Sequence, residues 1–368
     1  MMASPGKATI AVDARLIGAS GIGTYLRELL PRMAAARPEL SFAFLGPSSV
    51  LDDLPWTDTS NVRIIDLDVS IYSVQEQIVL PWSIPAGTDL LWSPHYNIPL
   101  AWRGRLAVTV HDLAHLALPE FVGGVHRRAY SRFMFRQVSR RANAIITVSD
   151  FTATEFDRLV GSQGVEPEVV HSGVDRGWFK IPPSASPHAR PYLIYVGNVK
   201  PHKNLGRLLE AFRQVASRIQ CDLLILGKNE GFLSSDRTAR ATAEGLAPRV
   251  QLLGALPQEE LMRYVSHAEA LVLPSLYEGF GLPPLEAMAC GCPAIVSNVA
   301  SLPEVCGDAA VYFNPFEPTS IAEAILRVQK EPGLRETLQC RGLERARRFT
   351  WESSAGRTLS ILESALAG

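Results

Sequence analysis

The sequence has little cysteine and no long hydrophobic run. Its five cysteines, an odd number among 368 residues, show no paired C-x-x-C spacing of the kind that binds zinc, and we expect most of them to be buried. No uninterrupted apolar run reaches the roughly 18 to 20 residues that a membrane-spanning helix needs. The first residues lack the charged and apolar regions of a signal peptide. Together these absences predict the reducing cytoplasm as the compartment.

The sequence also lacks an excess of charge of one sign. The formal net charge is -1 at pH 7, which argues against a nucleic-acid partner, because such a partner requires a broad basic surface. With 47% hydrophobic and 20% charged residues, the composition is that of a soluble globular protein with a substantial core. The length fits two domains of common size better than one.

Short β-rich runs such as "SFAFLG" and "AVTVHD" alternate with helical patterns along nearly the whole chain. This alternation predicts an α/β fold made of two Rossmann-like doubly wound domains that face each other across a cleft. We expect an N-terminal domain over 1–180, a linker rich in Pro and Ser over 181–191, and a C-terminal domain over 192–349. A final helix over 350–368 is expected to pack back on the first domain.

In an open parallel sheet, ligands bind beyond the carboxyl ends of the strands, so the strand-to-helix loops are the candidate sites. The first such loop contains Gly21 and Gly23, which let backbone N–H groups come close to a phosphate or a sugar. A tight turn explains these glycines equally well.

The second loop lies in "YVGNVKPHKNL", where a strand ends at Gly197 and Asn198. Asn204 is expected to cap the following helix, and Lys203 comes just before it. An ammonium group at the positive end of a helix is unfavourable unless an anion lies between them, so this loop is a candidate anion site. For His202 we favour an exposed structural role.

The third loop lies in "SLYEGFGLPPLEAM", whose proline pair starts a helix. Backbone amides of the loop and of the helix start could hold a diphosphate, and these residues are Gly279, Phe280, Gly281 and Leu282. Glu286 is expected in the first helical turn, where the helix dipole favours it even without a function. Glu278 lies in the loop itself, and its position suggests that it accepts hydrogen bonds from sugar hydroxyls.

Two further features lie in the first half of the chain. His111 and Asp112 end a buried strand and are site candidates, although Asp112 could instead close an Asx turn or cap a helix. The predicted helix over 126–141 carries one arginine per turn on one face, at Arg128, Arg132, Arg136 and Arg140. It could contact anionic lipid, or it could be a solvated basic face.

With these motifs, the chain resembles the retaining GT-B-fold glycosyltransferases of the large family that includes bacterial mannosyltransferases, sucrose synthases and glycogen synthases. The resemblance covers essentially the whole chain, and its most specific part is "EGFGLPPLEAMACGCP", which is similar to the family's Glu-x7-Glu motif. "GIGTYLREL", "VTVHDLAHLALPE" and "GNVKPHKNL" support it.

The resemblance implies a role for each matching residue. Glu286 would bind the ribose hydroxyls of a nucleotide-sugar donor, and Glu278 would contact the transferred sugar. Lys203 would neutralise charge on the leaving phosphate. The expected catalytic residues are His111, Lys203 and Glu278. The expected substrate-binding residues are Gly21, Gly23, Asp112, Asn198, Gly279, Phe280, Gly281, Leu282 and Glu286.

One departure is that many relatives carry a basic residue where this chain has Asn198, so Lys203 would act with less help, from Lys200 or His202. No metal and no cofactor are expected, because Lys203 and helix dipoles would meet the phosphate charge. The expected activity is transfer of a hexose from a nucleoside-diphosphate sugar, with GDP-mannose favoured, to a glycan or glycolipid hydroxyl. A UDP-sugar donor, an epimerase or hydrolase on the same fold, and a non-catalytic partner subunit remain alternatives.

Overall fold

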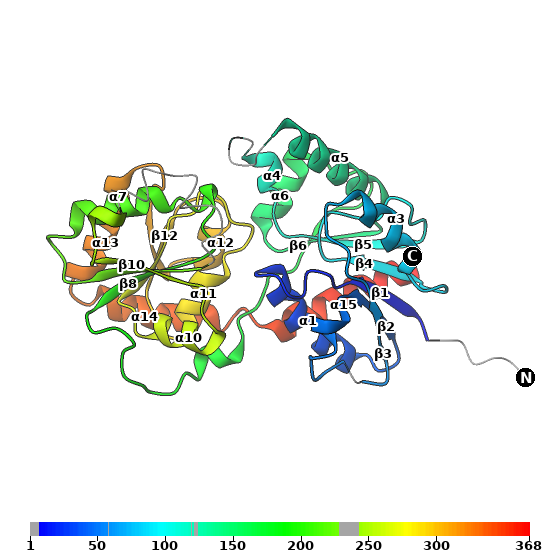
Figure 1. Cartoon of the computed structure of the whole chain (residues 1–368), viewed down its shortest axis with the longest axis horizontal. Helices are drawn as coiled ribbons and strands as arrows, with labels where there is room; N and C mark the ends of the chain where they lie inside the picture. Colours follow the sequence, from blue (N-terminus) through cyan, green and yellow to red (C-terminus); the bar gives the residue numbers. More distant parts are fainter. Residues whose placement is uncertain (1–6, 58, 119, 121–123, 228–242) are drawn as a thin grey trace, which may run out of the picture. The chain divides into compact units, whose positions relative to one another are not determined.

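The computed structural model describes residues 7–57, 59–118, 120, 124–227 and 243–368. The chain divides into two compact units (Figure 1). Unit 1 comprises Met1–Gly173 and Thr350–Gly368, and unit 2 comprises Val174–Phe349. None of the helices in the described ranges combines the length and the apolar character needed to cross a bilayer.

Unit 1 is built on one parallel sheet with the strand order β3-β2-β1-β4-β5-β6-β7. Its strands are β1 (Thr9–Asp13), β2 (Ser41–Gly46), β3 (Val62–Asp66), β4 (Leu90–Ser93), β5 (Arg105–Val110), β6 (Ala144–Thr147) and β7 (Glu168–Val169). Its helices are α1 (Ile22–Ala36), α2 (Ser48–Leu51), α3 (Val74–Ser83), α4 (Ala114–Ala117), α5 (Val125–Arg141), α6 (Asp150–Leu159) and α15 (Trp351–Ala367).

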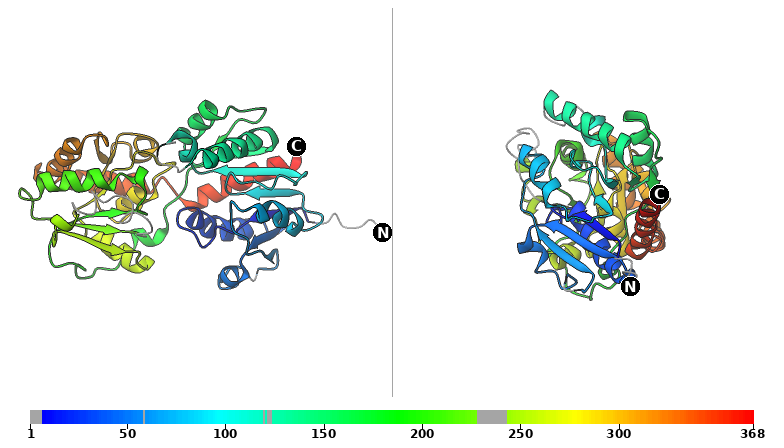
Figure 2. Two further views of the ribbon diagram at one scale, coloured as in Figure 1. Left: turned by 45° about the horizontal axis from the view of Figure 1, so that its top comes forward. Right: turned by 90° about the vertical axis from the view of Figure 1, so that its right-hand side faces the viewer.

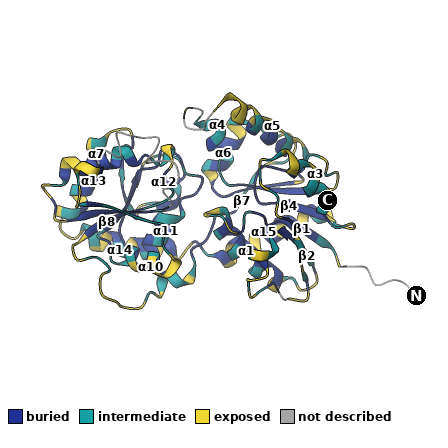
Figure 3. Ribbon diagram, in the orientation of Figure 1, coloured by how far each residue is buried: buried dark blue, intermediate teal, exposed yellow. Residues whose placement is uncertain are grey.

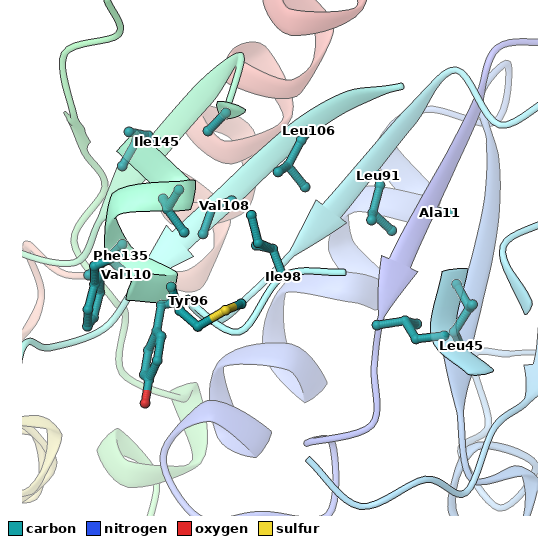
Figure 4. Close-up of a cluster of buried hydrophobic side chains, with 14 of the residues drawn as sticks. Ala11, Leu45, Leu91, Tyr96, Ile98, Leu106, Val108, Val110, Phe135 and Ile145 are labelled. Carbon is teal, nitrogen blue, oxygen red and sulfur yellow. The ribbon is translucent and has the colours of Figure 1, made fainter. Parts of the chain in front are cut away.

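Helices cover both faces of this sheet, as Figure 2 shows for α15 on one face and α5 on the other. On the α5 face, strand residues such as Leu91, Val108 and Ile145 pack against Met134 and Phe135 of α5 (Figure 4). Burial on both faces explains why the strands read as apolar runs rather than as alternating patterns.

Unit 2 contains a second parallel sheet, in the order β10-β9-β8-β11-β12-β13. Its strands are β8 (Tyr192–Val196), β9 (Asp222–Leu226), β10 (Val250–Gly254), β11 (Ala270–Leu273), β12 (Ala294–Ser297) and β13 (Ala310–Phe313). Its helices are η1 (Arg176–Phe179), η2 (Pro201–Lys203), α7 (Leu205–Val215), α10 (Gln258–Ser266), α11 (Leu282–Ala289), α12 (Leu302–Cys306), α13 (Pro318–Lys330) and α14 (Leu334–Ala346).

The two sheets place the carboxyl ends of β1, β5, β8 and β11 where the candidate loops begin. The α/β fold with two Rossmann-like units is therefore as predicted. The unit boundary differs from the expected one, because unit 1 ends at Gly173, before the segment 181–191. The Pro and Ser content of 181–191 marks irregular backbone inside unit 2 rather than the point where the chain leaves unit 1.

The final helix belongs to unit 1 although it is distant in sequence from the rest of that unit. α15 packs against α1 and against β4, β5 and β6. Its buried residues include Trp351, whose ring meets the Tyr25 ring of α1 edge to face at 6.1 Å. A Cβ on Gly173 would lie 2.2 Å from the backbone nitrogen of Trp351, so only glycine permits this approach.

Candidate functional site

In unit 2, the loop between β11 and α11 turns sharply at a glycine. Gly281 is the N-cap of α11 and has φ 102°, a conformation that favours glycine. A Cβ there would also lie 2.8 Å from Cδ2 of Leu302. α11 begins at Leu282, so Glu286 lies beyond the first turn, and the predicted first-turn position is wrong. The helix starts one residue before the proline pair, which moves Glu286 further along it.

Ser301 fixes the peptide planes of this loop. Its buried hydroxyl contacts the carbonyl oxygens of Glu278 at 2.9 Å and of Phe280 at 2.7 Å. In a trans peptide the N–H points opposite to the C=O. The amides of Gly279 and Gly281 therefore point away from Ser301, and the Phe280 side chain packs edge to face on Phe349 at 5.7 Å. Two carbonyl oxygens of the loop are thus held by Ser301, and its amides are oriented next to a helix N-terminus.

Lys203 and Glu278, predicted from separate loops, meet in the structure. Lys203 Nζ lies 2.5 Å from Glu278 Oε1, and their side chains are 19% and 11% exposed. The same carboxylate oxygen accepts a hydrogen bond from Ser275 Oγ at 2.7 Å. The sequence suggested that a lysine before a helix requires an anion, and in this structure Glu278 supplies the negative charge.

Asn204 joins the two loops, and its side chain does not cap α7 as expected. It adopts a left-handed conformation with φ 60°, and its Nδ2 donates to the carbonyl oxygens of Pro274 at 3.0 Å and Pro315 at 2.7 Å. A backbone hydrogen bond from Leu276 N to His202 O, at 2.8 Å, joins the same two loops. Asn204 therefore sets the positions of the loops that carry Lys203 and Glu278.

Asn198 lies beyond the carboxyl end of β8, at the same edge of the sheet, and its carbonyl oxygen accepts a long hydrogen bond from Tyr195 Oη at 3.4 Å. Lys200 is exposed and His202 is half-buried. The role of Lys200 and His202 as helpers of Lys203 stays a prediction.

Glu286 is a partly buried carboxyl group on α11 with an unusual acidity. Burial raises the pKa of Glu286 to about 7, and the negative charge of Asp175 acts in the same direction. Near neutral pH this side chain is therefore divided between its acid and its carboxylate form. A hydrogen-bond donor that binds to the carboxylate would favour ionisation.

In unit 1, Gly21 and Gly23 have different reasons to be glycine. Gly21 is the N-cap of α1 with φ 72°, and nothing lies within 4 Å of where its Cβ would be. A Cβ on Gly23 would lie 2.6 Å from the carbonyl oxygen of Ile17, so this residue is required for packing the loop on the helix. The tight-turn alternative thus accounts for the positive φ of Gly21, and backbone packing accounts for Gly23. The space beside Gly21, at the N-terminus of α1, is open.

His111 follows β5 and is neutral at physiological pH. Burial lowers the pKa of His111 to about 4. Its Nε2 lies 3.0 Å from the carbonyl oxygen of Pro94, so that nitrogen carries the proton, and its ring meets Tyr25 edge to face at 4.8 Å. A neutral, fixed ring suits a positioning role and does not suit a cationic one.

Asp112 Oδ1 accepts a hydrogen bond from Ala114 N at 2.9 Å, which is the Asx turn named as the alternative.

A buried charged network at the same edge of unit 1 was missed from the sequence. Arg15 contacts Asp13 at 2.6 Å and Glu76 at 2.5 Å, and His95 Nε2 lies 3.0 Å from Asp13. Burial alone would raise the pKa of Asp13, but Arg15 and His95 outweigh it and hold that pKa well below its ordinary value. The only sign of this network in the sequence is that charged residues follow the apolar runs of buried strands. Asn97 extends the network with a bond to Glu76 at 2.5 Å.

One Asp-x-Asp triplet, of the kind that metal-dependent glycosyltransferases use, is present at Asp66, Leu67 and Asp68. It lies at the end of β3, the edge strand, far along the sheet from β5. Asp66 Oδ1 accepts from Ser48 N at 2.9 Å, the first residue of α2. This triplet therefore serves a local helix start, and the expected absence of a metal stays a prediction.

Two protein-family models match the chain, and they meet near the boundary between unit 1 and unit 2. The family described as "Glycosyltransferase Family 4" matches residues 19–178, and the family described as "Glycosyl transferases group 1" matches residues 178–345. The chain belongs to the GT-B glycosyltransferases. The matched ranges include all the candidate residues in both units of this glycosyltransferase.

A curated relative spans nearly the whole glycosyltransferase. The "O-antigen chain mannosyltransferase B" of Escherichia coli is 29% identical over 370 residues, covering 93% of this chain and 95% of the relative. Among solved structures, sucrose-phosphate synthase from Thermosynechococcus elongatus has a TM-score of 0.77 at 21% identity, covering 98% and 99% of the two chains. Anabaena HepE in complex with UDP-glucose has a TM-score of 0.75 at 16% identity, covering 97% and 99%.

Proposed function

We propose that this glycosyltransferase is a retaining mannosyltransferase that uses GDP-mannose and acts on a hydroxyl of a glycan or lipid-linked glycan in polysaccharide biosynthesis. The observation that carries the proposal is the meeting of Lys203 and Glu278 at the loop before the N-terminus of α11. The E. coli O-antigen mannosyltransferase, similar over nearly its full length, supports the choice of mannose.

Each group in unit 2 would have a separate task in binding the donor. The amides of Gly279, Gly281 and Leu282 would receive the diphosphate, and the Glu286 carboxylate would accept hydrogen bonds from the ribose. The donor would separate the present ion pair. Lys203 would then move its charge to the phosphate, and Glu278 would turn to the sugar hydroxyls.

The chemistry follows from where negative charge develops. As the glycosidic bond breaks, its electron pair goes to the phosphate oxygen, and Lys203 stabilises that charge without a metal. The acceptor oxygen bonds to the anomeric carbon on the same face, and its proton passes to the departing phosphate oxygen. In unit 1, neutral His111 would act as a positioning group for substrate, and Gly21 would leave the N-terminus of α1 open to it.

The proposal also includes peripheral membrane contact on the cytoplasmic side through 126–141. The arginines Arg128, Arg132, Arg136 and Arg140 are all exposed on α5. An acceptor attached to a lipid would require the enzyme to work at a membrane surface.

The test is a transfer assay with purified protein, GDP-mannose or UDP-glucose, and an extract of lipid-linked glycans, followed by NMR of the anomeric proton in the product. An α-linked mannosyl product supports retention, since the donor is α-linked. A β-linked product would overturn retention, and transfer from UDP-glucose alone would replace the donor. UDP-glucose is included because the Anabaena structure of the same fold contains it.

A further inference from the structure

The outer face of α3 carries an apolar stripe that the proposed reaction does not use. Val74, Ile78 and Trp82 follow one another at intervals of one helical turn and are 83%, 61% and 87% exposed. The opposite face of the helix holds the buried Glu76 and Leu80. Single exposed apolar residues are ordinary, but an aligned set that ends in an almost fully exposed tryptophan marks a surface for interaction.

This stripe lies in the same layer as the basic helix α5. Leu80 of α3 and Met134 and Phe135 of α5 belong to one hydrophobic cluster, so both helices cover the same face of the unit 1 sheet (Figure 1). At one end, the rings of Tyr72 and Tyr130 meet at 6.5 Å. The outer faces of both helices therefore point away from the sheet on the same side of unit 1.

The outer face of α5 adds positive charge to this surface. The helix has six arginines and no acidic residue. Arg128, Arg132 and Arg136 are exposed, and none of them forms an ion pair with a carboxylate in the described part of the chain. Phe133, 47% exposed, follows Arg132 in the same helix. Figure 3 shows exposed stretches of α5 in yellow. The surface thus combines apolar side chains, an aromatic residue and unpaired cations.

We propose that the outer faces of α3 and α5 dock together on an anionic phospholipid bilayer, with Val74, Ile78 and Trp82 inserted at the boundary between headgroups and acyl chains. The purpose of such docking rests on the proposed function, because a lipid-linked acceptor is presented there. An exposed tryptophan on α3 together with exposed arginines on α5 is a combination typical of membrane-interface surfaces. A second copy of this chain is a poor occupant, since it would bring two basic α5 helices together.

The test is co-sedimentation with phosphatidylcholine vesicles that contain or lack phosphatidylglycerol. The wild-type chain is compared with the triple variant Val74→Ser, Ile78→Ser, Trp82→Ser and with Arg128→Gln, Arg132→Gln, Arg136→Gln. The matched control is Phe316→Ser, because Phe316 is an apolar residue of unit 2 that is 58% exposed. Circular dichroism and thermal denaturation check that each variant is folded, and GDP-mannose binding in solution is measured separately.

We expect wild type and the control to bind only the vesicles that contain phosphatidylglycerol, and less so at high salt. The α3 variant should lose about tenfold or more in partitioning, because apolar area no longer enters the interface. The arginine variant should lose both binding and its salt dependence.

Wild type that ignores anionic vesicles, or an α3 variant that binds as well as wild type, would overturn the proposal. If the α3 variant instead abolished a dimer seen by light scattering, the occupant would be a second copy. If the protein binds vesicles and does not bind GDP-mannose, the proposed donor is wrong and the proposed docking surface is supported.

Discussion

At the scale of single residues, Lys203 and Glu278 neutralise each other in the protein without donor. The two side chains meet in a part of the fold where solvent access is limited, with exposed fractions of 19% and 11%. A donor that arrives with phosphates and hydroxyls offers each of them a new partner. In the proposed reaction, the two side chains would separate and act on different parts of the donor.

Lys203→Ala should lower kcat by about 100-fold or more, since it removes the cation that faces the developing phosphate charge. Lys200→Ala, which removes the exposed lysine named above as a helper in the same loop, should lower kcat much less than Lys203→Ala does. Steady-state turnover of the nucleotide sugar measures both. Equal loss in the two variants would mean that general loop charge matters rather than the Lys203 position.

The pKa of Glu286 predicts how donor affinity depends on pH. Burial raises that pKa to about 7, and the ribose would bind the ionised form, so the affinity for GDP should fall as the pH drops below about 7. Calorimetric titrations across this range should show a slope in wild type. Glu286→Gln has no proton to lose and should flatten it, and an unchanged slope would remove Glu286 from the ribose.

The same shift affects stability in the opposite sense. An acid whose folded pKa lies above the ordinary 4.5 is penalised once the unfolded chain ionises, so stability is lost between pH 4.5 and about 7. Above that range the penalty is constant. Denaturation of the unliganded protein at several pH values should therefore show that the free energy of unfolding of Glu286→Gln, relative to that of wild type, increases as the pH rises.

Asn204 shows what sequence could not reveal about the site. Its residue type suits a helix cap, but its amide donates to carbonyl oxygens of residues that lie 70 and 111 positions away. Arg15 and Glu76, 61 positions apart, are a similar case. A local sequence pattern does not reveal partners that are so distant along the chain. The loops with the candidate residues could therefore be predicted, and the hydrogen bonds between those loops could not.

Asn204→Asp should destabilise the fold by about 2 to 4 kcal/mol, because an acceptor would replace the donor that meets two buried carbonyls. Asn204→Gly keeps the left-handed backbone without strain and should cost less. Urea denaturation of both variants measures the difference. Variants as stable as wild type would show that the amide bonds contribute little.

At the scale of elements, strands were more predictable than helix starts. Strands buried on both faces read as short apolar runs, and the two runs quoted above, "SFAFLG" and "AVTVHD", match β2 and overlap β5, respectively, in the structure. The start of α11 depends instead on one glycine conformation, φ 102° at Gly281, which composition alone does not fix. The position of the loop was therefore predicted correctly, and the position of Glu286 within the helix was not.

Gly281→Ala should disturb this turn, because alanine is strained at φ 102° and its Cβ would meet Leu302 at 2.8 Å. We expect a loss of about 1 to 3 kcal/mol in stability and weaker donor binding. Gly356→Ala, in α15 with open space around it, is the control and should be neutral or stabilising by up to about 1 kcal/mol. Thermal denaturation with and without GDP-mannose separates the two effects.

At the scale of the whole molecule, each unit has its own sheet and its own set of candidate residues. Unit 2 holds the pair Lys203 and Glu278, the oriented amides and Glu286, which together suit a nucleoside diphosphate and its sugar. Unit 1 holds His111 and the open N-terminus of α1. The two family matches, which meet at residue 178, describe the same division.

The central claim is that this chain binds a nucleotide sugar, and a thermal-shift panel of GDP-mannose, UDP-glucose, ADP-glucose and TDP-glucose tests it most directly. A ligand present at about 100 times its Kd stabilises the folded state by about 2.7 kcal/mol, which is a readily measured rise in Tm. We expect GDP-mannose to give the largest rise, and Glu286→Ala to reduce it. A melting temperature that none of the four compounds changes would contradict the account.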